Sequence, residues 1–135
     1  MPCLFCSIVD GSTSADVVLA DDVAVAFLDA APVFEGHVLV VPRMHHVVLG
    51  DLAVDVIGPF FERVQRVAGA VERALGSGGT WVSMNNRVSQ SVAHLHVHVV
   101  PRTKGDGLRG FYWPRRRYPD AAAASAIAER IRREL

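Results

Sequence analysis

The chain is poor in the features that mark secreted, membrane-bound or disulfide-stabilised proteins. It has only two cysteines in 135 residues, and half of its residues are hydrophobic, which suits one compact domain that needs no disulfides. No apolar run approaches the roughly 20 residues of a membrane helix, and the first six residues lack the basic start and apolar core of a signal peptide. We therefore expect a cytoplasmic protein with no membrane partner.

Neither sign of charge is in excess, since Lys plus Arg and Asp plus Glu number 14 each. Nucleic acid is therefore not expected as a partner by default. The later part of the chain nevertheless has a basic stretch whose only acidic residue is Asp106. Such a stretch either attracts an anion or forms a solvated loop, which is the simpler interpretation. Its cations are Arg102, Lys104, Arg109, Arg115, Arg116 and Arg117.

Hydrophobic patterning predicts an α+β fold. Short apolar or β-branched runs predict five strands, over residues 17–19, 23–28, 37–41, 80–84 and 93–100. Apolar residues recur every three or four positions from Leu52 to Leu75, which predicts one long helix. Because a proline inside a helix costs about 3 kcal/mol, we expect the continuous part to begin near Pro59 and to end at Gly76.

A last helix is predicted for residues 120–135. Asp120 is a suitable N-cap, and Ile127, Ile131 and Leu135 share one face. We expect a single domain over residues 1–135, with this C-terminal helix as an appendage.

The segment His94-Leu95-His96-Val97-His98 contains three of the six histidines. Side chains alternate across a strand, so we expect the three imidazoles on one face and the apolar residues on the other, packed on the long helix. Two chemistries fit this pattern. His-x-His can place two nitrogens on one zinc ion, and an imidazole that is neutral near pH 7 can act as a nucleophile.

The surrounding residues, Gln90-Ser91-Val92-Ala93-His94-Leu95-His96-Val97-His98-Val99-Val100, closely resemble the signature of the histidine triad (HIT) family. That signature is His-φ-His-φ-His-φ-φ, with φ apolar, usually preceded by Gln-Ser or Gln-Thr. Ala26-Phe27-Leu28-Asp29 and the run from Gly36 to His45 resemble the family's N-terminal half, in matching order. The resemblance implies a HIT-like fold with about five antiparallel strands, one long central helix and, outside the resemblance, a C-terminal helix.

By this resemblance, His96 is the nucleophile that attacks the α-phosphorus and forms a nucleotidyl intermediate, and His98 contacts the phosphate and assists the leaving group. Asp29 accepts hydrogen bonds from ribose hydroxyls, Phe27 contacts the base, and His37 has a supporting role. Phosphate and leaving-group contacts are expected from Asn85 or Asn86, Gln90 and Ser91. The segment from Asn85 to Gln90 is about two residues shorter than usual and lacks the family's customary glycines. The sequence therefore does not decide which of the two asparagines points toward the phosphates.

Cys3-Leu4-Phe5-Cys6 is a C-x-x-C motif, which by itself fits a redox pair, an incidental spacing or half of a zinc site. Bacterial HIT relatives with C-x-x-C at this place resemble zinc proteins. The resemblance implies a structural zinc held by Cys3, Cys6, His45 and His94, with His46 as a possible substitute ligand.

The resemblance therefore implies an enzyme, a nucleotide phosphohydrolase that cleaves a dinucleoside polyphosphate, a nucleoside phosphoramidate or a related adenosine or guanosine nucleotide. It implies a homodimer and no organic cofactor. The alternatives are a nucleotidyltransferase or phosphorylase, a nucleotide-binding regulatory module with incidental hydrolysis, and a metalloenzyme that uses the triad as ligands. Residues 104–115 are expected near the site opening or in an exposed loop.

Overall fold

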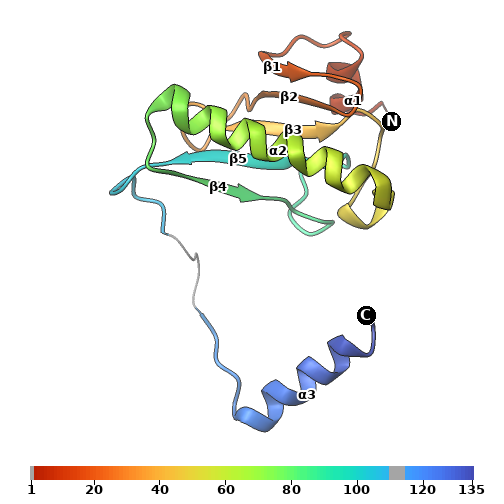
Figure 1. The fold of residues 1–135 in the computed structure, drawn as a ribbon, viewed down its shortest axis with the longest axis vertical. Coiled ribbons are helices and arrows are strands. Elements are labelled where there is room, and N and C mark those ends of the chain that lie inside the picture. Colours follow the sequence, from red (N-terminus) through yellow and green to blue (C-terminus); the bar gives the residue numbers. More distant parts are fainter. Residues whose placement is uncertain (1, 110–114) are drawn as a thin grey trace.

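The computed structural model describes residues 2–109 and 115–135, and its central feature is one antiparallel sheet (Figure 1). Its strands lie in the order β1-β2-β3-β5-β4. Their bounds are Val17–Ala20 for β1, Ala24–Leu28 for β2, Val38–Pro42 for β3, Gly79–Ser83 for β4 and Val97–Arg102 for β5. The predicted α+β class and five-stranded antiparallel sheet are confirmed.

The long helix α2, Val54–Leu75, crosses one face of the sheet (Figure 1). It ends as predicted at Gly76, whose φ of 62° is the left-handed conformation that glycine adopts at little cost. The predicted start near Pro59 was wrong, because the helix begins one and a half turns earlier. Pro59 removes only one donor. Val56 packs against the core one turn before Phe60, which offsets that loss.

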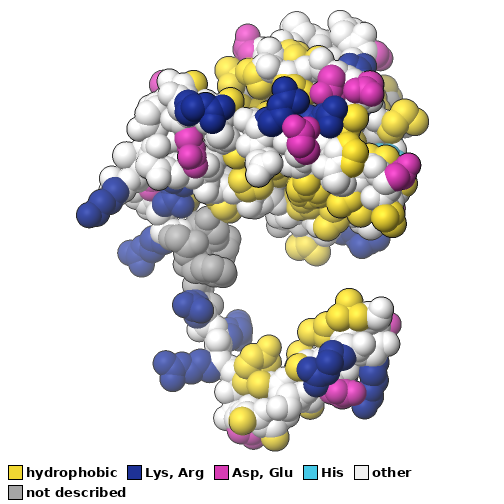
Figure 2. All heavy atoms as spheres, in the orientation of Figure 1, with side chains coloured by type: hydrophobic (Ala, Val, Ile, Leu, Met, Phe, Trp, Pro, Cys, Tyr) yellow, Lys and Arg dark blue, Asp and Glu magenta, His cyan; other side chains and the backbone are white. Residues whose placement is uncertain are grey.

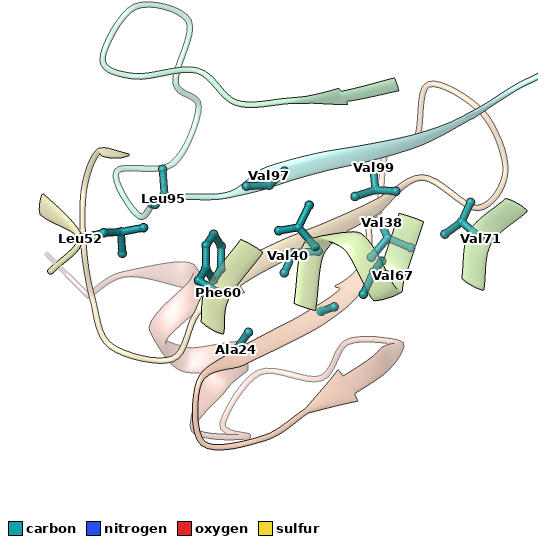
Figure 3. Close-up of a cluster of buried hydrophobic side chains, with 12 residues drawn as sticks. Ala24, Val38, Val40, Leu52, Phe60, Val67, Val71, Leu95, Val97 and Val99 are labelled. Carbon is teal, nitrogen blue, oxygen red and sulfur yellow. The ribbon is translucent and has the colours of Figure 1, made fainter. Parts of the chain in front are cut away.

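The core between α2 and the sheet is built from the predicted stripe of α2 (Figure 3). Phe60, Val64, Val67 and Val71 pack on strand residues that point to the same side, and Leu95, Val97 and Val99 are fully buried there. Burying each such side chain contributes about 1.5–3 kcal/mol. The apolar half of the histidine segment therefore faces the helix, as predicted.

Strand β5 begins at Val97 rather than at Ala93, so the predicted single strand through all three histidines was wrong. β3 pairs with β5 only from Val38↔Val99 to Val40↔Val97. Beyond that point the ring of His94 bonds to the carbonyl of Pro42 at 2.9 Å, and the Leu95 N–H donates to the carbonyl of His46. His98 thus lies in the strand, while His94 lies in a bend before it.

The opposite face of the sheet carries a second apolar cluster and the short helix α1, Leu4–Val9, which the sequence did not predict. Phe5 of α1 packs edge-on against Phe27 of β2, with ring centroids 5.4 Å apart. His98 is paired with Leu39, a member of this cluster, so its side chain points to the α1 face. In agreement, His side chains are almost absent from the α2 face that Figure 2 shows.

Helix α3, Ala121–Arg132, stands apart from the sheet (Figure 1) and has no buried residue. Asp120 caps it as predicted, since its Oδ1 accepts the N–H of Ala123 at 2.7 Å. Figure 2 shows Lys and Arg side chains along the segment that leads to it. Arg102, by contrast, pairs with Asp106 at 2.7 Å and closes its own loop. Among the described residues no helix is long and apolar enough to cross a bilayer.

Candidate active site and metal centre

His96 is held so that one ring nitrogen is free for chemistry. Its ring is 3% exposed and lies edge-on to Phe5 and to His98, with centroid distances of 5.1 and 5.0 Å. Nδ1 is 2.8 Å from the carbonyl oxygen of His94. A carbonyl can only accept, so Nδ1 carries the proton and donates it. The lone pair of a neutral His96 therefore resides on Nε2, which leaves Nε2 as the ring atom able to act as a nucleophile.

His98 and His37 form a hydrogen-bonded pair beside His96. His37 precedes β3, and its Nε2 is 2.9 Å from Nδ1 of His98. Asp29, which follows β2, has its Oδ2 3.6 Å from the same Nε2. Burial, with help from the nearby His96 and His37 rings, lowers the pKa of His98 to about 4. Burial also lowers the pKa of His37, although Asp29 opposes this shift. Both rings are therefore neutral near pH 7.

The turn before β3 sets the position of His37. Gly36 has φ of 93°, and the N–H of His37 donates to the carbonyl of Phe34 at 3.0 Å. A Cβ on Gly36 would lie 2.2 Å from Leu75 at the end of α2. Glycine is therefore favoured here mainly for its conformation, because the close contact is with the tip of the exposed Leu75 side chain, which can move aside.

Cys3, Cys6, His45 and His94 converge at the N-terminus of α1. One ligand atom from each lies within 4.8 Å of the others. Cys3 is the N-cap of α1 and Cys6 lies three residues later, so the C-x-x-C spacing places both thiols on the first helical turn. His94 Nδ1 is 3.5 Å from both sulfurs, and His45 Nδ1 is 3.2 Å from Cys6 Sγ.

These separations fit a tetrahedral zinc ion. Zn–S bonds of about 2.3 Å and Zn–N bonds of about 2.0–2.1 Å place sulfur and nitrogen about 3.5 Å apart. His94 Nε2 donates to the carbonyl of Pro42 at 2.9 Å, which leaves the Nδ1 lone pair directed at the thiols. Burial and the Cys3 thiol raise the pKa of the Cys6 thiol. His46 lies outside this group of ligand atoms and is not needed to complete it.

Metal binding by the three triad histidines together has no support in this geometry. Among residues 2–109 and 115–135, the groups that could hold an ion contain His94 with the cysteines, or His98 with Asp29 and His37, and neither contains His96. Of the three histidines, His94 thus belongs to the candidate metal group with the cysteines, whereas His96 and His98 lie outside that group.

The loop before the triad uses two of its predicted phosphate ligands for structure. Asn86 Oδ1 accepts the N–H of Leu49, at the start of the 3-10 helix Leu49–Asp51, at 2.7 Å. Gln90 donates to the carbonyl of Val47 and accepts the N–H of Arg87, at 2.6 and 3.0 Å. Asn85 and Ser91 are exposed.

In the same loop, Arg87 and Ser89 have φ of 70° and 61°, the left-handed region that favours glycine. The customary glycines of the family are missing from the segment between Asn85 and Gln90, and two of its residues take a conformation that suits glycine. The hydrogen bonds of Asn86 and Gln90 compensate for this strain.

Phe27 is 3% exposed and packs on Phe5, so its ring offers little area to a base. Phe5 itself, which contacts His96, was not singled out from the sequence, because an aromatic residue between two cysteines carries no distinctive pattern. Residues 110–114 of the expected site opening lie outside the described residues.

A family model described as the HIT domain matches residues 10–105 of the chain. The chain belongs to the HIT domain family. This HIT protein is 32% identical over 116 residues to the adenosine 5'-monophosphoramidase hnt1 of Schizosaccharomyces pombe, and the match covers 84% of each chain.

Two solved structures support the same assignment. A HIT family protein from Bacillus subtilis superposes with a TM-score of 0.88 at 30% identity, over 100% of this chain and 98% of the other. A zinc-bound histidine triad protein from Mycobacterium smegmatis superposes with a TM-score of 0.75 at 33% identity, over 96% and 98%. The HIT fold of this chain and its likeness to a zinc-binding relative are thus established.

Proposed function

We propose that this HIT protein is a nucleotide hydrolase that acts at an α-phosphorus through a covalent adduct on His96. The observation that carries the proposal is the bond from His96 Nδ1–H to the His94 carbonyl, which leaves the lone pair on Nε2. A buried neutral imidazole so oriented is a suitable nucleophile, and a nucleotidyl-histidine is reactive enough for water to hydrolyse.

In the first step, His96 Nε2 bonds to phosphorus while the bond from phosphorus to the leaving group breaks. The leaving group keeps the electron pair and takes up a proton from solvent. In the second step, water bonds to phosphorus, the P–N bond to His96 breaks, and the water releases a proton to solvent. The proton taken up in the first step is thereby returned, and the net reaction consumes one water. His98, next to His96, supports the departure of the leaving group.

The substrate class we propose is an adenosine or guanosine phosphoramidate, with dinucleoside polyphosphates as the second choice. The phosphoramidase name of the fission yeast relative supports the first choice. Asp29 borders the histidine pair and is partly exposed, so its carboxylate is available to ribose hydroxyls. Asn85 and Ser91 are exposed polar side chains of the loop before the triad and are available to a phosphate.

Mass spectrometry of protein mixed with adenosine 5'-phosphoramidate tests this proposal. We expect a nucleotidyl adduct on His96 in the wild type, no adduct in His96→Ala, and a normal adduct in His46→Ala, the matched control from outside the site. A fully active His96→Ala protein would contradict the proposal. Binding without turnover of any nucleotide class would indicate a regulatory module, and transfer to an acceptor other than water would indicate a transferase.

We also propose that Cys3, Cys6, His45 and His94 hold a structural zinc ion. Four protein ligands leave no open position for substrate, which is typical of structural sites. Such an ion would join α1 to the bend before β5 and so keep the His94 carbonyl in place for His96. Its contribution to catalysis is this positioning.

A homodimer is the third element of the proposal. β4 is an outer strand of the sheet, and Val82 on it is 45% exposed. An edge strand of this kind can pair with another chain. We expect light scattering to give twice the 14.6 kDa chain mass, and a monomer for Val82→Pro if the edge forms the contact.

A further inference from the structure

The hydrogen bonds around His37 determine which of its nitrogens carries a proton. The backbone N–H of Val33 is 3.1 Å from His37 Nδ1. A backbone N–H can only donate, so Nδ1 of His37 must accept. His37 is 3% exposed, and burial disfavours its charged form. Neutral His37 therefore carries its hydrogen on Nε2.

Among the residues that the structure describes, that hydrogen has one good acceptor. His98 Nδ1 lies 2.9 Å from His37 Nε2, a normal hydrogen-bond length. The Asp29 carboxylate is at 3.6 Å from the same nitrogen, which is too long for a hydrogen bond. Asp29 also accepts the N–H of Ala31 through its other oxygen, at 2.9 Å. The Nε2–H of His37 is thus given to His98 rather than to Asp29.

Since His98 Nδ1 accepts, a neutral His98 must carry its own hydrogen on Nε2. We propose that His37 is a positioning residue that holds His98 in the Nε2–H tautomer, so that His98 presents a hydrogen-bond donor to the leaving group. The chain of donation runs from the Val33 N–H to His37 and from His37 to His98. The catalytic part of this inference rests on the proposed function, whereas the tautomer of His98 does not.

The alternative tautomer would reverse the role of His98. With hydrogen on Nδ1, the Nε2 atom of His98 would present a lone pair to the substrate. That lone pair and the negative charge of the substrate would repel each other. With hydrogen on Nε2, His98 donates to the charge that develops as the bond to phosphorus breaks, and donors placed in advance are the more effective ones. His98 transfers no proton in this scheme, which agrees with a ring that is neutral near pH 7.

The test is nitrogen-15 NMR of the full-length protein, in which long-range proton–nitrogen correlations distinguish the two tautomers of each histidine. Three proteins are compared: wild type, His37→Gln, whose amide can still donate to His98, and His37→Leu, which cannot. We expect Nε2–H for His98 in wild type and in His37→Gln. We expect loss of that single tautomer in His37→Leu.

Kinetics with the phosphoramidate provide the second readout. His37→Leu should lower kcat on the order of 10- to 100-fold with little change in KM, and His37→Gln should recover most of that loss. His46→Gln serves as the control for removing a histidine outside the pair. Dispersed amide spectra establish that each variant is folded, and the Gln variant keeps the test valid if the Leu variant is not.

An Nδ1–H tautomer of His98 in the wild type would overturn the inference. So would an unchanged tautomer and kcat in His37→Leu. A second zinc equivalent that needs His37 would also overturn it, because Asp29, His37 and His98 would then share an ion rather than a hydrogen bond. If no adduct forms on His96 while the tautomer result holds, the proposed function fails and the tautomer assignment stands.

Discussion

Acidification should destabilise this protein through His98. Its pKa is lowered from the ordinary value of 6.5 to about 4 by burial and by the neighbouring His96 and His37 rings. Below pH 6.5 the unfolded chain takes up a proton at this residue that the folded protein resists. Stability is therefore full above the unfolded pKa, falls as the pH drops through 6.5, and levels off below about 4.

The size of this effect follows from the two pKa values. Proton uptake by the unfolded state costs the folded state about 2 kcal/mol between pH 7 and pH 5, and about 3 kcal/mol by pH 4. Because the ring is partly buried rather than sealed from solvent, these are upper values.

Urea unfolding of wild type and His98→Gln at pH 7, 6, 5 and 4 measures the effect. Glutamine does not titrate, so the difference in the free energy of unfolding between the two proteins isolates His98. Any acid-induced loss of zinc is common to both and cancels. From pH 7 to pH 5, we expect the free energy of unfolding of the wild type to fall by about 2 kcal/mol relative to that of His98→Gln. A difference independent of pH would refute the reasoning from burial.

Three further predictions concern stability. Phe60 is fully buried under the sheet, so Phe60→Ala should cost about 3–5 kcal/mol in urea unfolding, whereas Val54→Ala, at an 88% exposed position of the same helix, should cost little. Ser89 has φ of 61°, so Ser89→Gly should stabilise the protein by about 0.5–1 kcal/mol, and a loss of stability would contradict strain in that loop. Chelation should lower the Tm of the wild type with proton uptake by the freed thiols, and should leave Cys3→Ser unchanged; equal effects on both proteins would argue against zinc at this site.

The sequence by itself determined the elements whose signals are local. Short apolar or β-branched runs indicated the strands, the spacing from Leu52 to Leu75 indicated the core face of α2, and Asp120 indicated the start of α3. The motif around His96 was sufficient to identify the HIT family, which the family match to residues 10–105 confirms. These features depend on neighbours a few residues away, so periodicity and capping reveal them.

The tertiary structure decided how the histidines differ. His94 is turned out of the strand because its ring bonds to Pro42, 52 residues earlier, and its other nitrogen meets two thiols from the N-terminus. The tautomer of His98 is set by His37, 61 residues earlier, and by the backbone N–H of Val33 that bonds to His37. No pattern of side chains in the sequence predicts that backbone contact. The tautomer of a histidine ring depends on the distant groups that bond to it, and a metal-ligand group depends on side chains from distant parts of the chain. Only folding brings these residues together.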